Sequence, residues 1–326
     1  MDSLAKDTRR FALFARLTWA LLGYDVLVIA WGAYVRATFS GDGCGSHWPL
    51  CNGELAFPEQ TKTLVEASHR VTAGVSLVFG IALALYALYI FPRDKPVRRA
   101  AVLSAVFISA EALIGAFIVL FRYVAHDKSL ERALSMTLHL TNTFFLLGSL
   151  ALTAYYASGG VPATFRGRGF RGGLALAALG SMIALGMTGA LAALGDTLFP
   201  ARTLVEGLTQ DLNLKSDILL KLRTAHPFVA VVSSVIILAF ASYAPGEAAA
   251  PRVRRLARAL MILVFVQLGL GALNVALLAP IPIQLIHLVS ADAVWVLLVM
   301  LVCEVLARET DRAKTSDVEG FAKLER

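Results

Sequence analysis

Four of the six histidines in the 326-residue chain lie inside long apolar segments, and their types and positions suggest one chemistry. They are His69, His139, His226 and His287. Imidazoles that face each other in pairs are what the axial ligation of a haem iron requires. Polar residues inside a membrane are candidates for function because burying them there is costly. The sequence therefore predicts two bis-histidine sites, His69 with His139 and His226 with His287.

The alternative is that each of these histidines only hydrogen-bonds to a neighbouring helix. Their matched depth favours ligation, because each falls about five to eight residues after its apolar segment begins. At ~1.5 Å per residue, all four lie roughly 8–12 Å below the same surface. The other two, His47 and His126, are expected to be solvated loop residues.

The elements that carry these histidines must be membrane helices. Hydrophobic residues make up 57% of the chain and charged residues 16%, with a mean hydropathy of +0.69. Soluble domains are typically ~45–50% apolar and ~25% charged, so a soluble domain, a disordered tail and a disulfide-rich secreted module are excluded. A membrane helix needs roughly 20 mostly apolar residues. Eight segments qualify: Leu17–Val35, Leu64–Phe91, Ala100–Phe121, Ala133–Tyr156, Leu174–Leu194, Ile218–Tyr243, Leu256–Leu278 and Ile281–Leu306.

The basic residues predict the orientation of these spans. With a cytoplasmic N-terminus, the inside segments hold 20 of the 30 lysines and arginines, as short cytoplasmic loops do. Both termini are then cytoplasmic, and the net charge of +7 needs no nucleic-acid partner to explain it. No organelle-targeting extension precedes the first span, which favours the bacterial plasma membrane.

The chain contains an internal repeat. His226 follows His69 by 157 residues, Gln267 follows Glu111 by 156, and His287 follows His139 by 148. A longer outer loop in the first half explains the smaller offset. We therefore expect an all-α membrane protein of two tandem four-helix bundles, residues 1–160 and 161–326.

Glu66 distinguishes the two halves. It precedes His69 by three residues, on the same helix face and one turn nearer the outer surface. The second half has Arg223 at the matching place. A catalytic acid beside one site is one interpretation, and a carboxylate that caps its helix is the other. Three further intramembrane acids, Asp25, Glu111 and Asp292, are interpreted as interhelical hydrogen-bonding groups, with a proton path as the weaker alternative.

The outer loop between the first two spans contains Cys44 and Cys51. The outer face is oxidising, so the pair could be a structural disulfide. It could equally be a redox-active pair above the first site. Haem propionates would point to the outer surface, where the cationic candidates to pair with them are Arg36, Arg70, Lys221 and Arg223. Ordinary interfacial anchoring is the alternative for each of them.

Taken together, these segments resemble the haem A synthase family over nearly the whole chain. The resemblance is carried by GAYVRATFSGDGCGSHWPLCNG, VEASHR, LHLTN, AHPF and IHL. It implies an eight-helix enzyme that oxidises the C8 methyl of haem O to a formyl group, making haem A for terminal oxidases. His226 and His287 would hold a haem b cofactor, His69 and His139 would bracket the substrate haem, and Glu66 would take part in the chemistry.

The resemblance also implies partners. These are haem O, an electron acceptor such as quinone, and haem O synthase, which would hand over the substrate directly. A homo-oligomer is also compatible with the sequence. One departure from the family is that the loop over residues 195–217 lacks the second cysteine pair of some members.

The rival interpretation is a non-catalytic bis-histidine cytochrome b that carries electrons from quinol. It explains the histidines, but neither Glu66 on one side only nor the cysteine loop. A haem transporter would need access from both faces, whereas all four ligands lie near one.

Overall fold

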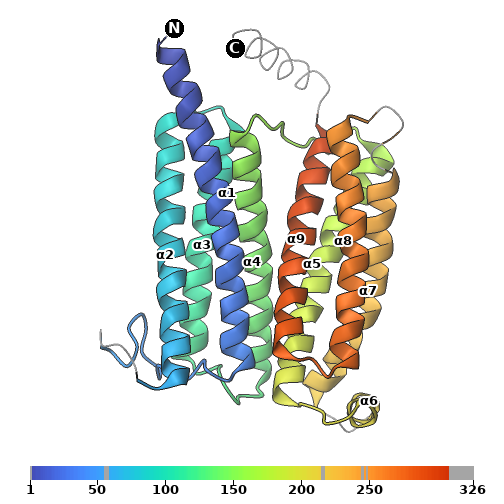
Figure 1. Ribbon diagram of the computed structural model, residues 1–326. Coiled ribbons are helices and arrows are strands. Elements are labelled where there is room, and N and C mark those ends of the chain that lie inside the picture. Colours follow the sequence, from blue (N-terminus) through green and yellow to red (C-terminus); the bar gives the residue numbers. More distant parts are fainter. Residues whose placement is uncertain (1, 55–58, 214–216, 244–245, 247–248, 308–326) are drawn as a thin grey trace.

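The computed structural model describes residues 2–54, 59–213, 217–243, 246 and 249–307, with side chains from residue 8 onward. The described chain is built from helices joined by loops (Figure 1). The helices are α1 (Asp2–Ala37), α2 (Thr61–Ile90), α3 (Pro96–Leu120), α4 (Leu130–Ala157), α5 (Gly169–Leu198), α6 (Leu204–Leu212), α7 (Ile218–Tyr243), α8 (Pro251–Ala276) and α9 (Ile281–Leu306).

The long helices pack in two groups of four. In the first bundle, α1 and α3 each contact both α2 and α4, so that α2 and α4 lie diagonally. In the second bundle, α5 and α8 each contact both α7 and α9, which are the diagonal pair there. The diagonal helices are the ones that carry the four intramembrane histidines.

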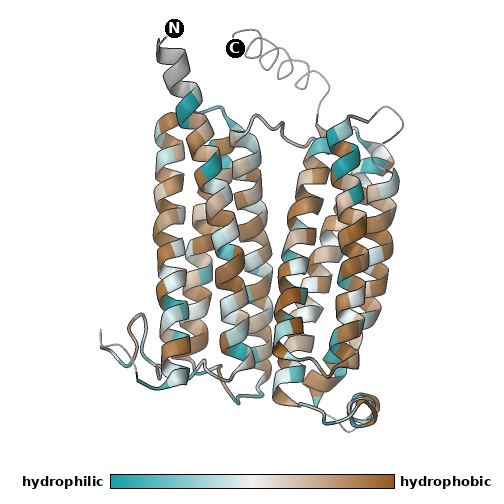
Figure 2. Cartoon of the chain, viewed as in Figure 1, coloured by the Kyte–Doolittle hydropathy of each residue, from teal (hydrophilic) through white to brown (hydrophobic). Residues whose placement is uncertain are grey.

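Seven of the described helices are long and apolar enough to cross a membrane. They are all of the long helices except α4, and Figure 2 shows their mainly hydrophobic surfaces. The chain is thus an all-α, multi-pass membrane protein. Serine, threonine, asparagine and histidine residues lower the hydropathy of α4, which is also the helix with the longest set of buried residues. The predicted span Ala133–Tyr156 is therefore a helix, α4, but its composition alone does not identify it as a membrane span.

The two bundles share a continuous buried core, in which α4 faces α5 and α9. Phe144 on α4 stacks on Trp295 of α9 with ring centroids 5.3 Å apart, and the Trp295 indole N–H donates to the Phe144 carbonyl at 2.6 Å. Gly186 on α5 makes room for this stack, since a Cβ there would lie 2.3 Å from the Phe144 ring. The bundles are therefore joined by close packing as well as by the connecting chain.

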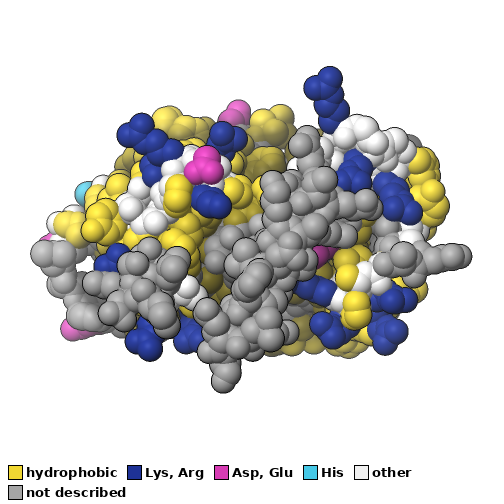
Figure 3. Space-filling model, turned by 90° about the horizontal axis from the view of Figure 1, so that it is seen from above, with side chains coloured by type: hydrophobic (Ala, Val, Ile, Leu, Met, Phe, Trp, Pro, Cys, Tyr) yellow, Lys and Arg dark blue, Asp and Glu magenta, His cyan; other side chains and the backbone are white. Residues whose placement is uncertain are grey.

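The two ends of the molecule differ in character. We call the end that carries residues 38–54 and α6 the loop end, and the opposite end, with the start of α1 and residue 307, the arginine end (Figure 1). Viewed from the arginine end, Figure 3 shows Lys and Arg side chains spread over both bundles.

Helix α6 lies within a segment that the sequence analysis treated as a plain loop. Its Leu204, Leu208 and Leu212 repeat every four residues and are exposed. In Figure 1 it is seen end-on, across the direction of the long helices. A short amphipathic helix of this kind suits a membrane–water interface.

Candidate functional site

The first histidine pair lies across the first bundle. His69 is on α2 and His139 is on α4, the two diagonal helices, and their imidazoles are close enough to interact electrostatically. The second pair repeats this arrangement, with His226 on α7 and His287 on α9, also within electrostatic range of each other. The structure thus brings together the residues of each predicted pair.

Glycines on neighbouring helices make room for the imidazole rings. A Cβ on Gly32 of α1 would lie 2.9 Å from the His69 Cε1 atom, and one on Gly189 of α5 would lie 3.2 Å from the His226 Cε1 atom. These glycines are separated by 157 residues, the same offset as their histidines. Gly271 on α8 approaches His287 in the same way, at 3.3 Å. Larger side chains at these positions would displace the rings.

The histidine pairs fit a haem better than a bare metal ion. Within the described residues no group of three or more His, Cys, Asp or Glu side chains could hold an ion. Haem iron needs only two axial ligands from the protein, because the porphyrin supplies the others. The Nδ1 atoms of His69, His139 and His287 are buried and make no hydrogen bond within the described part of the chain, although Glu111 Oε1 lies 3.4 Å from that of His139. Haem iron would take the other ring nitrogen, Nε2, of each imidazole.

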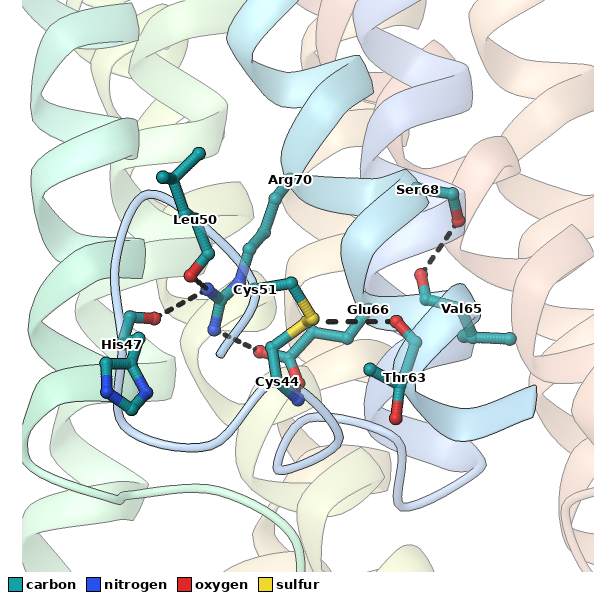
Figure 4. Close-up of a disulfide and its surroundings, with 9 residues drawn as sticks. All are labelled: Cys44, His47, Leu50, Cys51, Thr63, Val65, Glu66, Ser68 and Arg70. Atoms are coloured by element: carbon teal, nitrogen blue, oxygen red, sulfur yellow. Dashed lines mark hydrogen bonds and ion pairs between the residues drawn. A yellow bond between two sulfur atoms is a disulfide. The ribbon is translucent and has the colours of Figure 1, made fainter. Parts of the chain in front are cut away.

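Glu66 is buried, with 3% of its surface exposed, and both carboxylate oxygens have partners from different segments (Figure 4). Oε2 accepts from the backbone N–H of Cys44 at 2.9 Å, and Oε1 accepts from Arg70 Nη2 at 2.6 Å. The N-cap of α2 is Gln60, without a side-chain cap. Glu66 therefore joins α2 to the loop over residues 38–54. This role differs from the helix capping that the sequence left open.

Cys44 and Cys51 form a disulfide that closes the loop. Arg70 of α2 anchors this loop by hydrogen bonds, because its Nη1 donates to the carbonyls of His47 at 2.6 Å and Leu50 at 3.2 Å (Figure 4). The sequence suggested a propionate partner or an interfacial anchor for Arg70, and neither interpretation includes these contacts to the loop. Its contacts to the loop depend on how residues far apart along the chain fold together, and no local pattern indicates them.

The other cationic candidates lie in different surroundings. Arg36, at the end of α1, reaches the second bundle, where it donates to the Ala193 carbonyl at 2.5 Å, to Thr197 and to Gln284 Oε1 at 3.0 Å. Arg36 therefore joins the two bundles at the loop end.

Arg223 makes ion pairs with Asp196 at 3.1 Å and Asp211 at 2.5 Å. The position that matches Glu66 is thus occupied by a cation with two acidic partners. Lys221 is exposed.

The three intramembrane acids differ in their contacts. Asp25 accepts from Ser76 of α2, and Glu111 accepts from the amide of Asn142 on α4, both interhelical hydrogen bonds as predicted. Asp292 is fully buried and neither oxygen has a hydrogen-bond partner among the described residues, so the same prediction is wrong for it there. Sequence reasoning missed that Glu111 also approaches His139, with 3.4 Å between Oε1 and Nδ1.

Comparison with known proteins gives a consistent family. The model of the COX15-CtaA family, described as cytochrome oxidase assembly protein, matches residues 15–299. Two Thermus thermophilus proteins named protoheme IX farnesyltransferase are 43% identical over 312 residues, 95% of this chain and 51% of theirs. The chain thus spans about half the length of these relatives.

Shorter matches are to proteins named heme A synthase. The one from Bacillus licheniformis is 38% identical over 112 residues, 34% of this chain and 37% of that protein. The one from Bacillus pumilus is 35% identical over 131 residues, 40% of each. Since the family model covers most of the sequence and both histidine pairs, the chain belongs to the COX15-CtaA family.

Proposed function

We propose that this chain is a haem A synthase that oxidises the C8 methyl of haem O to a formyl group. The observation that carries the proposal is the difference between two otherwise matched sites. Beside His69 stands the buried Glu66, held by a disulfide-closed loop. At the corresponding place beside His226 stands Arg223, paired with two aspartates. One site is thus built for chemistry at the edge of a bound group, and the other only for holding one.

His69 and His139 bind the substrate haem in this proposal, and Glu66 lies one helical turn from His69. A carboxylate there can accept a proton from the reacting carbon or stabilise positive charge that develops on it. Arg70 and the Cys44 N–H orient its two oxygens. Preorganised groups of this kind are effective because they need not reorient during the reaction.

His226 and His287 hold the haem b cofactor. With water as the source of the oxygen atom, the change of the methyl to a formyl group releases electrons and protons, and this group, when bound, would supply the one-electron transfer that carries the electrons onward. The protein around it contributes position: Thr188 lies 3.2 Å from His226 Nδ1, and Gln267 donates to the His287 carbonyl at 3.1 Å. A quinone is the expected electron acceptor, and haem O synthase the expected donor of the substrate.

We infer that all eight long helices cross the membrane, α4 included, as two repeat-related bundles of residues 1–160 and 161–326. The arginine end is cytoplasmic and the loop end lies outside, in a bacterial plasma membrane. The distribution of Lys and Arg and the disulfide at the loop end support this orientation.

Reporter fusions test the orientation. Fusions after Pro96 or Gly169 are expected to report cytoplasm, and fusions after Asn52 or Leu212 the outside. A cytoplasmic signal at Asn52 would reverse the orientation and would place the histidine pairs near the inner face.

The rival function is a bis-histidine cytochrome b that only carries electrons. It requires the four histidines but gives no role to the buried Glu66 or to the loop that holds it.

The name of the Thermus relatives belongs to chains about twice as long as this one, and about half of their length matches here. We therefore do not extend the transfer of a farnesyl group to this chain.

Pigment analysis separates these functions. The full chain, expressed together with a source of haem O, is expected to yield extractable haem A, whereas a host with the same source and an empty vector yields haem O only. Haem O that stays unchanged although the protein is present and haem-loaded would exclude the synthase and favour the electron carrier.

A further inference from the structure

We infer that Glu111 is a positioning residue that fixes the His139 ring and lowers the reduction potential of the haem bound between His69 and His139. The inference rests on the proposed function, because it takes His139 as an iron ligand. It assigns a role to an acid that the reaction at Glu66 does not use.

Glu111 is held against His139 by residues of the same helix. Its Oε1 lies 3.4 Å from His139 Nδ1, and its carboxylate accepts hydrogen bonds from Asn142 and Thr143. These two residues follow His139 by three and four positions and so share its helix face. The Asn142 amide also donates to the Phe107 carbonyl on α3 at 2.9 Å. The carboxylate is thus fixed in position beside the imidazole.

This placement decides which ring nitrogen is left for iron. A carboxylate near Nδ1 favours the tautomer that carries the proton there, and Nε2 remains available as a ligand. The carboxylate lies 3.4 Å from Nδ1, which makes no hydrogen bond in this structure, so it acts on the ring by its charge and by the hydrogen bond that a small rotation of the ring would form. Either interaction makes a ligating imidazole more basic. A more basic axial ligand stabilises ferric over ferrous iron, so the reduction potential falls. A substrate haem that is to lose electrons benefits from such a shift.

At the second site, the residue that matches Glu111 is a neutral glutamine rather than a carboxylate. Gln267 follows Glu111 by 156 residues and occupies the repeat-related position on α8. Its amide nitrogen lies 3.3 Å from His287 Nε2 and donates to the His287 carbonyl. A neutral amide cannot make the imidazole more basic as a carboxylate does. The two sites therefore differ in a second respect besides Glu66. The lower reduction potential of the first haem favours the passage of electrons from it to the second haem.

Redox titration of the haem-loaded, full-length protein tests the inference. The first-site haem is identified as the low-spin signal that is lost in His139→Ala. In Glu111→Gln we expect its reduction potential to rise and its ferric electron paramagnetic resonance signal to change, while the second haem keeps its potential. Glu111→Asp, which keeps the carboxylate but at a greater distance from Nδ1, should give a smaller shift in the same direction, and serves if Glu111→Gln loses its haem.

Asp25→Asn is the matched control. Asp25 is a buried carboxyl of the same bundle that bonds Ser76 rather than a histidine. Asp25 lies within electrostatic range of Glu111, so its replacement is expected to shift the potential of the first haem much less than Glu111→Gln does and to leave the second unchanged. An equal shift in Asp25→Asn, or no shift in haem-loaded Glu111→Gln, would overturn the inference and leave the proposed function intact. A wild-type protein with no haem ligated by His139 would overturn both.

Discussion

Haem A formation is expected to fall by ~10²–10⁴-fold in Glu66→Gln, which is the usual contribution of a positioned acid–base group. Glutamine keeps the size of the side chain and can still accept a hydrogen bond, but it cannot take a proton. The variant should therefore fold, keep its haem b and bind haem O. The measurement is the amount of haem A and of partly oxidised haem O per folded molecule.

A purely structural role of Glu66 predicts a different result. Both of its oxygens hold the cysteine loop, directly through Cys44 and indirectly through Arg70. If this were its whole role, the variant would lose stability by about 1–3 kcal/mol, the cost of leaving a buried hydrogen-bond partner unsatisfied. Product per folded molecule would then be unchanged, and that outcome would falsify the catalytic assignment. Arg70→Gln is the comparison variant, because it loosens the loop and releases one oxygen of Glu66 but keeps the carboxylate, so its haem A formation should fall less than in Glu66→Gln.

Replacing either His226 or His287 with alanine should abolish the low-spin haem b spectrum of the isolated protein. Low-spin haem of this kind needs two strong axial ligands, and each variant removes one of them. His69→Ala is the matched control and should retain haem b while it loses haem O binding. Optical spectra and haem extraction of the three proteins, purified in parallel, give the comparison.

The opposite pattern would reverse the assignment of the bundles. If His226→Ala and His287→Ala kept full low-spin haem b while His69→Ala lost it, the resident cofactor would lie in the first bundle. Glu66 would then stand beside the cofactor rather than beside the substrate, and the proposed mechanism would fail with the assignment.

The sequence predicted the helices well because lipid exposure demands long apolar segments, which are visible without any tertiary information. Five of the eight predicted segments lie within helices of the structure, and the other three end one or two residues beyond the ends of α2, α3 and α8. His69 and His139 lie on the diagonal helices of one bundle, as expected. The exception in composition, α4, is instructive. Many of its polar residues are buried. The buried hydroxyls mostly donate to carbonyls of α4 itself, and Asn142 and Thr143 bond to residues of α3. Low hydropathy is thus compatible with a buried helix.

What the sequence did not predict depends on contacts between distant segments. Arg36 donates to Ala193, 157 residues away, and no spacing rule indicates such a contact between the bundles. Helix α6 has only nine residues, too few for a convincing periodicity inside a polar segment. The approach of Glu111 to His139 depends on the rotation of α3 against α4. The repeat offset to Gln267 identified the position but not its role.

The hydrogen bond from Cys44 to Glu66 has a consequence for the order of events in biogenesis. In a newly inserted chain Cys44 and Cys51 are still thiols, and the loop between them is not yet closed. Glu66 then lacks the firm hold of the Cys44 N–H and of the loop carbonyls that anchor Arg70. In the proposed orientation, the first site would thus mature only after thiol oxidation on the outer side of the membrane. Under the proposed function, a chain with reduced thiols would bind haem by its histidines before Glu66 is held in place to act on it.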